Sequence, residues 1–120
     1  MAGELVPVEM VPRYSTYCGA TDFLTIAMDV SRYSAGQLTA WRGPAVGTTP
    51  TFGITCQESS DGVTWATCAD STADTDPGAN TEVALAPTFS RRFFRIKITL
   101  GGTSPVATCW ISGFLEQRVS

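Results

Sequence analysis

The sequence contains no histidine, so it lacks the side chain that most often acts as a general base, a metal ligand or the partner of a catalytic serine or cysteine. Lysine is nearly absent too, since the eight basic residues are one lysine, Lys97, and seven arginines. No apolar run approaches the ~20 residues that span a bilayer, and the first residues lack the basic and apolar regions of a signal peptide. We therefore expect a protein that is not an enzyme, is made in a cytoplasm and has no membrane partner.

The residues that are present point to one small acidic domain. The 120 residues suffice for a single hydrophobic core. The net charge of -3 gives no reason to expect nucleic acid as a partner, and no motif for a cofactor is present. Arginine is favoured at protein interfaces because of its planar hydrogen-bonding group, although a GC-rich coding genome would produce the same excess.

The cysteines do not form a recognisable metal site. Cys18, Cys56, Cys68 and Cys109 contain no C-x-x-C pair, and there is no histidine to complete a zinc site. Cys56 and Cys68 flank the Asp61-Gly62 turn symmetrically, so they can face each other across a hairpin. The pair could form a disulfide or remain as two reduced thiols, and a cytoplasmic origin favours the thiols.

Short runs of alternating apolar residues, separated by turn residues, indicate β-structure without helices. The predicted strands cover residues 23–30, 37–42, 51–59, 63–68, 80–86, 91–100 and 105–116. This pattern predicts an all-β fold, an antiparallel β-sandwich or jelly roll of about seven or eight strands. Because Pro7 and Pro12 discourage central pairing, we expect residues 1–22 to form an irregular N-terminal arm, which adds to a sheet edge or reaches a neighbour. Residues 23–120 then form the single sandwich domain.

Three local patterns refine the expected sandwich. The even positions from Leu24 to Val30 are apolar, which predicts that they face the core. Asp61 and Gly62 are expected to form a tight hairpin turn, after which Trp65 anchors the core. Residues 101–104 are expected to form a hairpin between the last two strands. Apolar residues on both faces of 105–116 indicate a central strand or one that another subunit covers.

The strand over 91–100 has one apolar face and one largely basic face, the latter formed by Arg91, Arg95 and Lys97. Together with Arg92 and Phe93, these side chains could bind phosphate or a carboxylate, or form an aromatic and basic surface for nucleic acid. A solvated sheet face or a subunit contact is the alternative that the acidic chain favours.

Two further groups have both a functional and a structural explanation. Asp70, Asp74 and Asp76 share a loop that could hold calcium, but their spacing differs from that of an EF-hand and favours a solubilising loop. The three tryptophans could form platforms for sugars, although tryptophan in a small sandwich more often fills the core. We therefore expect no catalytic, cofactor or metal site.

Two longer patterns resemble known families. The Ser59–Trp65 hairpin followed by Arg92–Ile96 is similar to discoidin-like β-sandwich modules. The Trp-rich opening strands and paired terminal cysteines of that family are missing, so its ligand-binding loops cannot be assigned here. A pattern that covers more of the chain resembles small tailed-phage virion proteins. It consists of an alternating strand over 23–30, a strand ending at Trp41, the same hairpin, the Arg-Arg-Phe-Phe-Arg-Ile strand and a closing strand over 104–113.

The second resemblance implies a virion structural protein of the capsid cement (decoration) type. Such a protein binds outside the shell, bridges copies of the major capsid protein and associates with copies of itself, often as a trimer. The candidate interface residues are Val6, Val8, Met10, Arg91, Arg92, Arg95, Phe114 and Arg118. Structural roles are assigned to Asp61, Gly62 and Trp65. Deleting residues 1–12 is expected to abolish decoration and to leave the fold intact. The alternatives are a carbohydrate- or surface-binding β-sandwich module and a tail or connector subunit.

Overall fold

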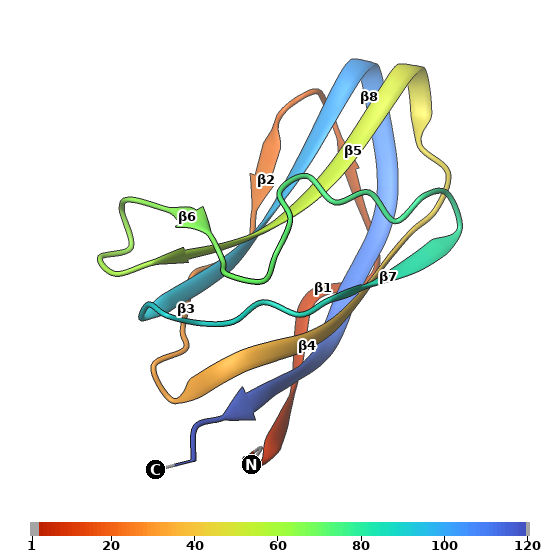
Figure 1. Cartoon of the computed structure of the whole chain (residues 1–120). Helices are drawn as coiled ribbons and strands as arrows, with labels where there is room; N and C mark the ends of the chain where they lie inside the picture. Colours follow the sequence, from red (N-terminus) through yellow and green to blue (C-terminus); the bar gives the residue numbers. More distant parts are fainter. Residues whose placement is uncertain (1–2, 120) are drawn as a thin grey trace.

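A computed structural model describes residues 3–119 and shows an all-β chain, which confirms the predicted fold class (Figure 1). The strands all pair antiparallel. They are β1 (Leu5–Cys18), β2 (Asp22–Leu24), β3 (Met28–Asp29), β4 (Tyr33–Arg42), β5 (Val46–Ser59), β6 (Ala66–Thr67), β7 (Thr81–Leu85) and β8 (Phe93–Gln117). The molecule is elongated, with extents of 50 × 28 × 20 Å.

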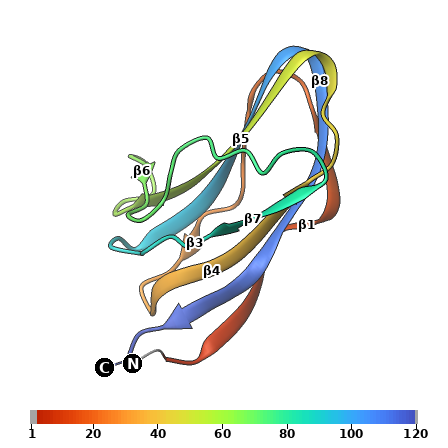
Figure 2. The same cartoon turned by 45° about the vertical axis from the view of Figure 1, so that its right-hand side comes forward.

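β8 is the central strand of both layers of the sandwich. Its first part pairs with β5 on one side and with β2 and β3 on the other. Its second part pairs with β4 and β1, and β7 continues that layer beyond β4. The strand pair of β5 and β8 turns over at one end of the molecule, so that the two parts of β8 belong to different layers (Figures 1 and 2).

The predicted hairpin at residues 101–104 is therefore wrong. Within the described residues the two parts of β8 do not pair with each other, because the paired strand β5 bends together with β8 and remains bonded to it. Register shifts on β5 on either side of Thr48 accommodate the bend. Gly102 lies at a φ of 100°, where a Cβ atom would come 2.6 Å from the Thr49 carbonyl oxygen.

The core lies between the two layers and is filled from alternate positions of the long strands. β8 contributes Phe94, Ile96, Ile98 and Leu100 before the bend and Ala107, Cys109, Ile111 and Leu115 after it. The predicted apolar face of the strand over 91–100 is thus confirmed. The strand itself begins at Phe93, so Arg91 and Arg92 lie in the bend before it. No helix among residues 3–119 is long and apolar enough to cross a membrane.

Residues 23–30 do not form one strand with an even-numbered core face. The pairing with β8 changes by one residue between Leu24 and Met28, which leaves an extra residue between β2 and β3. Because side chains alternate along a strand, this extra residue reverses the face that is buried. Leu24 is consequently 52% exposed and Ile26 is 89% exposed, whereas Val30 is fully buried.

The expected irregular arm is mostly an ordered strand. β1 pairs with β8 from Leu5 to Cys18 with two register shifts, and Val11 is only 1% exposed. Pro7 is tolerated because β1 is an edge strand, paired with β8 alone among the described strands. A deletion of residues 1–12 would remove part of the core, so the expectation that it leaves the fold intact is not supported. Met1 and Ala2 lie outside the described residues.

The segment around Asp61 is a turn, as predicted, but a longer one than a tight hairpin. β5 ends at Ser59 and β6 begins at Ala66, so residues 60–65 form the loop. Gly62 has a φ of 77°, a conformation that glycine adopts without strain. Trp65 does not anchor the core, because its half-buried ring lies outside the sandwich and is covered by the Arg95 guanidinium at 4.0 Å.

Candidate functional site

One edge of the sandwich exposes apolar side chains between its two layers. β1 forms one side and residues 24–28 form the other side of a groove of about 420 Å³. We call this edge the apolar rim; it is lined by Val8, Glu9, Met10, Tyr17, Leu24, Thr25, Ile26 and Met28. Val8 and Met10 also pack against the core, whereas Leu24 and Ile26 project into solvent. Exposed apolar side chains that gather in this way are typical of surfaces covered by another molecule.

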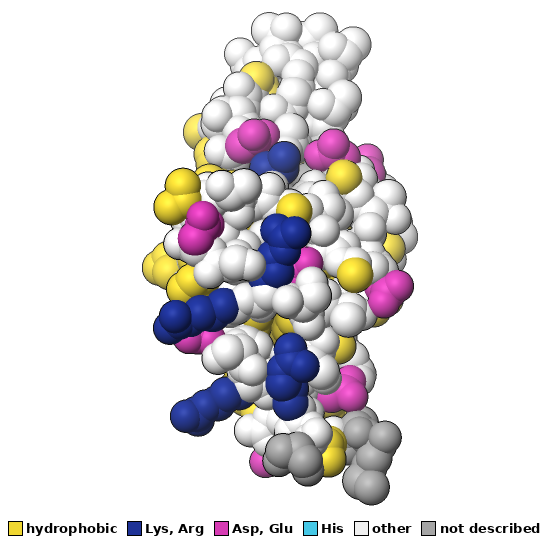
Figure 3. Space-filling view, turned by 60° about the vertical axis from the view of Figure 1, so that its left-hand side comes forward, with side chains coloured by type: hydrophobic (Ala, Val, Ile, Leu, Met, Phe, Trp, Pro, Cys, Tyr) yellow, Lys and Arg dark blue, Asp and Glu magenta, His cyan; other side chains and the backbone are white. Residues whose placement is uncertain are grey.

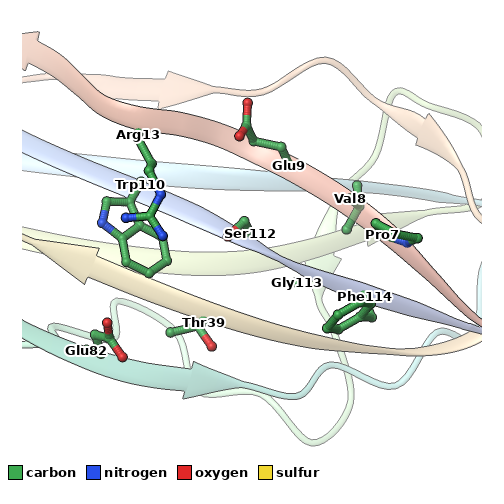
Figure 4. A pocket seen from close by; sticks show the side chains of 10 residues that line it. All are labelled: Pro7, Val8, Glu9, Arg13, Thr39, Glu82, Trp110, Ser112, Gly113 and Phe114. Carbon is green, nitrogen blue, oxygen red and sulfur yellow. The ribbon is translucent and has the colours of Figure 1, made fainter.

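A second groove, of about 680 Å³, lies on the outer face of the sheet of β1, β8, β4 and β7 (Figure 4). β8 and β4 form its floor, with β1 and β7 at its sides. We call it the aromatic groove; it is lined by Pro7, Val8, Glu9, Arg13, Thr39, Glu82, Trp110, Ser112, Gly113 and Phe114. The groove is shallow and open, so a bound molecule would lie along the sheet rather than inside it.

The aromatic groove ends at a group of stacked side chains. Trp41 and Trp110 are opposite each other on β4 and β8, and their rings stack with centroids 6.5 Å apart. The Arg13 guanidinium lies over Trp110 at 4.5 Å, and the Tyr14 ring meets Trp41 edge-on at 6.0 Å. A register shift in β1 before Ser15 and a φ of 61° at Tyr14 let the chain cover both tryptophans.

Several basic side chains are spread over another face of the molecule, with acidic side chains among them (Figure 3). Arg95 and Lys97 point outward from the first part of β8, opposite its buried face. Arg95 also donates a hydrogen bond to Gln57 at 2.8 Å, and its burial lowers its pKa. Arg92 pairs with Asp29 at 3.1 Å, and the Asp29 pKa falls to about 2, chiefly because of hydrogen bonds from Ser31 and also because of Arg92.

The predicted interface residues lie in three places, and the first two adjoin at Val8, which lines both grooves. Val8 and Met10 lie at the apolar rim, and the half-buried Val6 lies next to them on β1. Phe114, 44% exposed, lines the aromatic groove. The basic residues Arg91, Arg92, Arg95 and Arg118 lie apart from both grooves. Arg118 donates hydrogen bonds to the carbonyl groups of Ser31 and Phe89 and thereby fixes the end of the chain.

The aspartates of the acidic loop point in different directions. Asp76 accepts a hydrogen bond from Arg42 at 2.8 Å, and this contact lowers the pKa of Asp76. Asp70 accepts one from the Thr88 hydroxyl at 2.7 Å. Among residues 3–119, no three His, Cys, Asp or Glu side chains come together in a group that could hold a metal ion.

Three of the four cysteines are buried free thiols. The Cys68 amide donates to the Cys56 carbonyl at 2.9 Å, so the two residues do lie opposite each other as the turn suggested. Burial raises the pKa of Cys56 and of Cys109 to about 11 and raises that of Cys68 as well. These thiols therefore stay protonated at neutral pH and are poor nucleophiles. Cys18 is exposed.

Both grooves include residues that the sequence did not single out. Leu24 and Ile26 were expected in the core. No motif in the neighbouring sequence indicates the extra residue between β2 and β3 that turns them outward. No sequence motif includes Arg13, Glu9 or Glu82. The one available signal is Trp110, which alternates with the core residues of 105–116 and so belongs to the opposite face.

No protein-family model and no curated protein sequence matches this chain. Several solved structures show similarity to this chain. One is from Bacillus endospore appendages, a family of disulfide-linked pili, with 17% identity, 98% of this chain and 93% of that chain covered, and a TM-score of 0.44. Another is from infectious bursal disease virus strain Gx, with 11% identity and a TM-score of 0.48. The match covers 98% of this chain and 37% of that chain. A third is a carbohydrate-binding module in complex with calcium and xylotriose, with 14% identity and a TM-score of 0.38. The match covers 91% of this chain and 98% of that chain.

Proposed function

We propose that this chain is a non-enzymatic structural subunit of a virion, namely a capsid cement protein that binds the outside of the shell and bridges major capsid proteins. The apolar rim is the observation that carries this proposal. Ile26 at 89% and Leu24 at 52% exposure lie beside an apolar groove, in a chain that otherwise has a well-filled core. A partner that covers the rim would remove these side chains from water, at about 25 cal/mol per Å² of apolar surface.

The chemistry of the side chains supports a role in assembly. The chain has no histidine, and burial keeps the Cys56 and Cys109 thiols protonated. The most displaced carboxylate pKa values, those of Asp29 and Asp61, are low, so these groups are permanently charged hydrogen-bond acceptors at neutral pH. Such groups stabilise turns and do not transfer protons near pH 7.

A cement protein does not need a large interface in each copy. Each rim contributes one modest contact, and many equivalent positions on one shell add up through multivalency. Association with further copies of this chain, for example as a trimer, would strengthen the binding to the shell, because each trimer would present three rims. A tail or connector subunit would use the same kind of rim but would form a ring.

The rim can be tested without disturbing the core, because its outermost side chains are exposed. The double variant Leu24→Asp/Ile26→Asp should fold normally but fail to sediment with shells of the source virus, since each aspartate would place a charge in an apolar contact. Val63→Asp is the matched control, because Val63 is 80% exposed and lies in the loop before β6, outside the rim. Electron microscopy of the wild-type particle then distinguishes many shell copies from a few ring copies.

Two outcomes would contradict the proposal. Either the wild-type chain fails to sediment with shells, or the rim variant sediments as well as the Val63→Asp control. Circular dichroism of both variants shows whether a loss of binding reflects a loss of folding.

A further inference from the structure

The aromatic groove combines one exposed ring, Phe114 at 44%, and one ring that Arg13 covers, Trp110 at only 7% exposure, with polar side chains that make no ion pair or hydrogen bond among the described residues. The Trp110 ring lies at one end of the groove and Phe114 at the other (Figure 4). Phe114 is four positions after Trp110 along β8, which corresponds to about 13 Å at 3.3 Å per residue. This length suits a short chain of linked rings more than a single small molecule.

Polar groups line the groove from four strands. Glu9 lies on β1, Glu82 on β7, and the hydroxyls of Thr39 and Ser112 lie on the floor. The two ion pairs of the described residues, Arg42–Asp76 and Arg92–Asp29, involve neither glutamate. The groove therefore offers strong acceptors and hydroxyl groups to a ligand with many hydroxyls.

Arg13 supplies the donors at the aromatic end of the groove. Its guanidinium lies over the Trp110 ring at 4.5 Å, which places its N–H groups at this end of the groove. The backbone that carries it passes through Tyr14 at a φ of 61°, a conformation that costs a non-glycine residue free energy. The edge-on contact of Tyr14 with Trp41, which stacks on Trp110, holds this conformation in place.

We propose that the aromatic groove binds a neutral oligosaccharide. Sugar rings present C–H faces that pack on aromatic and guanidinium planes, and hydroxyls that pair with carboxylates and N–H donors. The charges favour a neutral ligand, because the two glutamates outnumber Arg13 and would repel a sialylated, sulfated or phosphorylated one. The groove shares Val8 and Glu9 with the apolar rim, but Leu24 and Ile26 belong to the rim alone.

The full chain should be tested on an array of immobilised neutral, sialylated and sulfated oligosaccharides, followed by calorimetry with the strongest neutral ligand. The variants Arg13→Ala and Glu82→Gln should each weaken binding about tenfold, the effect of losing roughly 1.4 kcal/mol. Ser112→Arg should abolish binding, because it fills the floor without removing a core residue. Arg95→Ala is the matched control, since it breaks the other arginine–tryptophan stack, at 4.0 Å over Trp65, and should leave binding unchanged.

Three results would overturn the proposal: no binding by the wild-type chain, binding of acidic glycans in preference to neutral ones, or full binding by Ser112→Arg and Glu82→Gln. Thermal unfolding of each variant confirms that the fold is intact. Because Leu24→Asp/Ile26→Asp leaves the groove unaltered, its glycan binding should equal that of the wild type even where it no longer sediments with shells.

Discussion

At the scale of single residues, Asp61 shows how one side chain organises a loop. Its carboxylate accepts hydrogen bonds from the amides of Val63 at 2.8 Å and Thr64 at 2.9 Å and from the Ser59 hydroxyl at 2.9 Å. Ser59 in turn accepts from the amide of Gly62 at 2.9 Å. Hydrogen bonds from backbone amides lower the pKa of Asp61 to about 2, and the bond from Thr64 has the largest effect.

We predict that Asp61→Ala lowers the melting temperature at pH 7 by several degrees, because two loop amides lose their acceptor. The folded pKa lies below the unfolded value, so the stabilisation is complete above about pH 4 and is lost as the pH falls through about 2. The gap between wild type and variant should therefore close over that acidic range. Thermal melts from pH 7 to pH 2 test this, and a gap that stays constant would contradict it.

At the scale of elements, the turnover of β5 and β8 decides the architecture. A glycine-rich stretch permits a hairpin or a bend equally well, because glycine adopts positive φ in both. Here β5 stays paired with β8 from Ser59 opposite Phe93 to Val46 opposite Val106, with shifts only at the bend. The pairing energy of the long ribbon therefore favours a bend that keeps both strands together.

We predict that Gly102→Ala destabilises the fold by about 1–3 kcal/mol more than Gly19→Ala. Both glycines have similar φ values, 100° and 105°, so both substitutions cost about 1 kcal/mol of backbone strain. At Gly102 the new Cβ would also come 2.6 Å from the Thr49 carbonyl oxygen, whereas at Gly19 it meets nothing within 4 Å. Urea unfolding measures the difference, and equal costs would show that the bend yields without strain.

At the scale of the whole molecule, the two layers are not separate units. β8 runs through both of them, and the core side chains come from both of its parts. A layer that unfolded alone would expose the core face of the other, so partial unfolding is unfavourable.

We predict a single cooperative unfolding transition. Trp65 reports on one layer, whereas Trp41 and Trp110 report on the other. Fluorescence melts of the Trp65→Phe variant should therefore share one midpoint with far-ultraviolet circular dichroism of the same protein. Two separated midpoints would show that the layers unfold independently.

The sequence by itself determined the features that depend on near neighbours. Strand alternation predicts an all-β sandwich, the buried face of the strand over 91–100 and the turn at Asp61-Gly62, because side-chain direction follows the strand period. Long-range pairing decided the rest: one extra residue turns Leu24 and Ile26 outward, β5 converts the expected hairpin into a bend, and β8 gives residues 5–18 a partner. The tertiary structure alone brings Arg13, Glu82 and Trp110 to one groove, because the three residues come from strands far apart in the sequence.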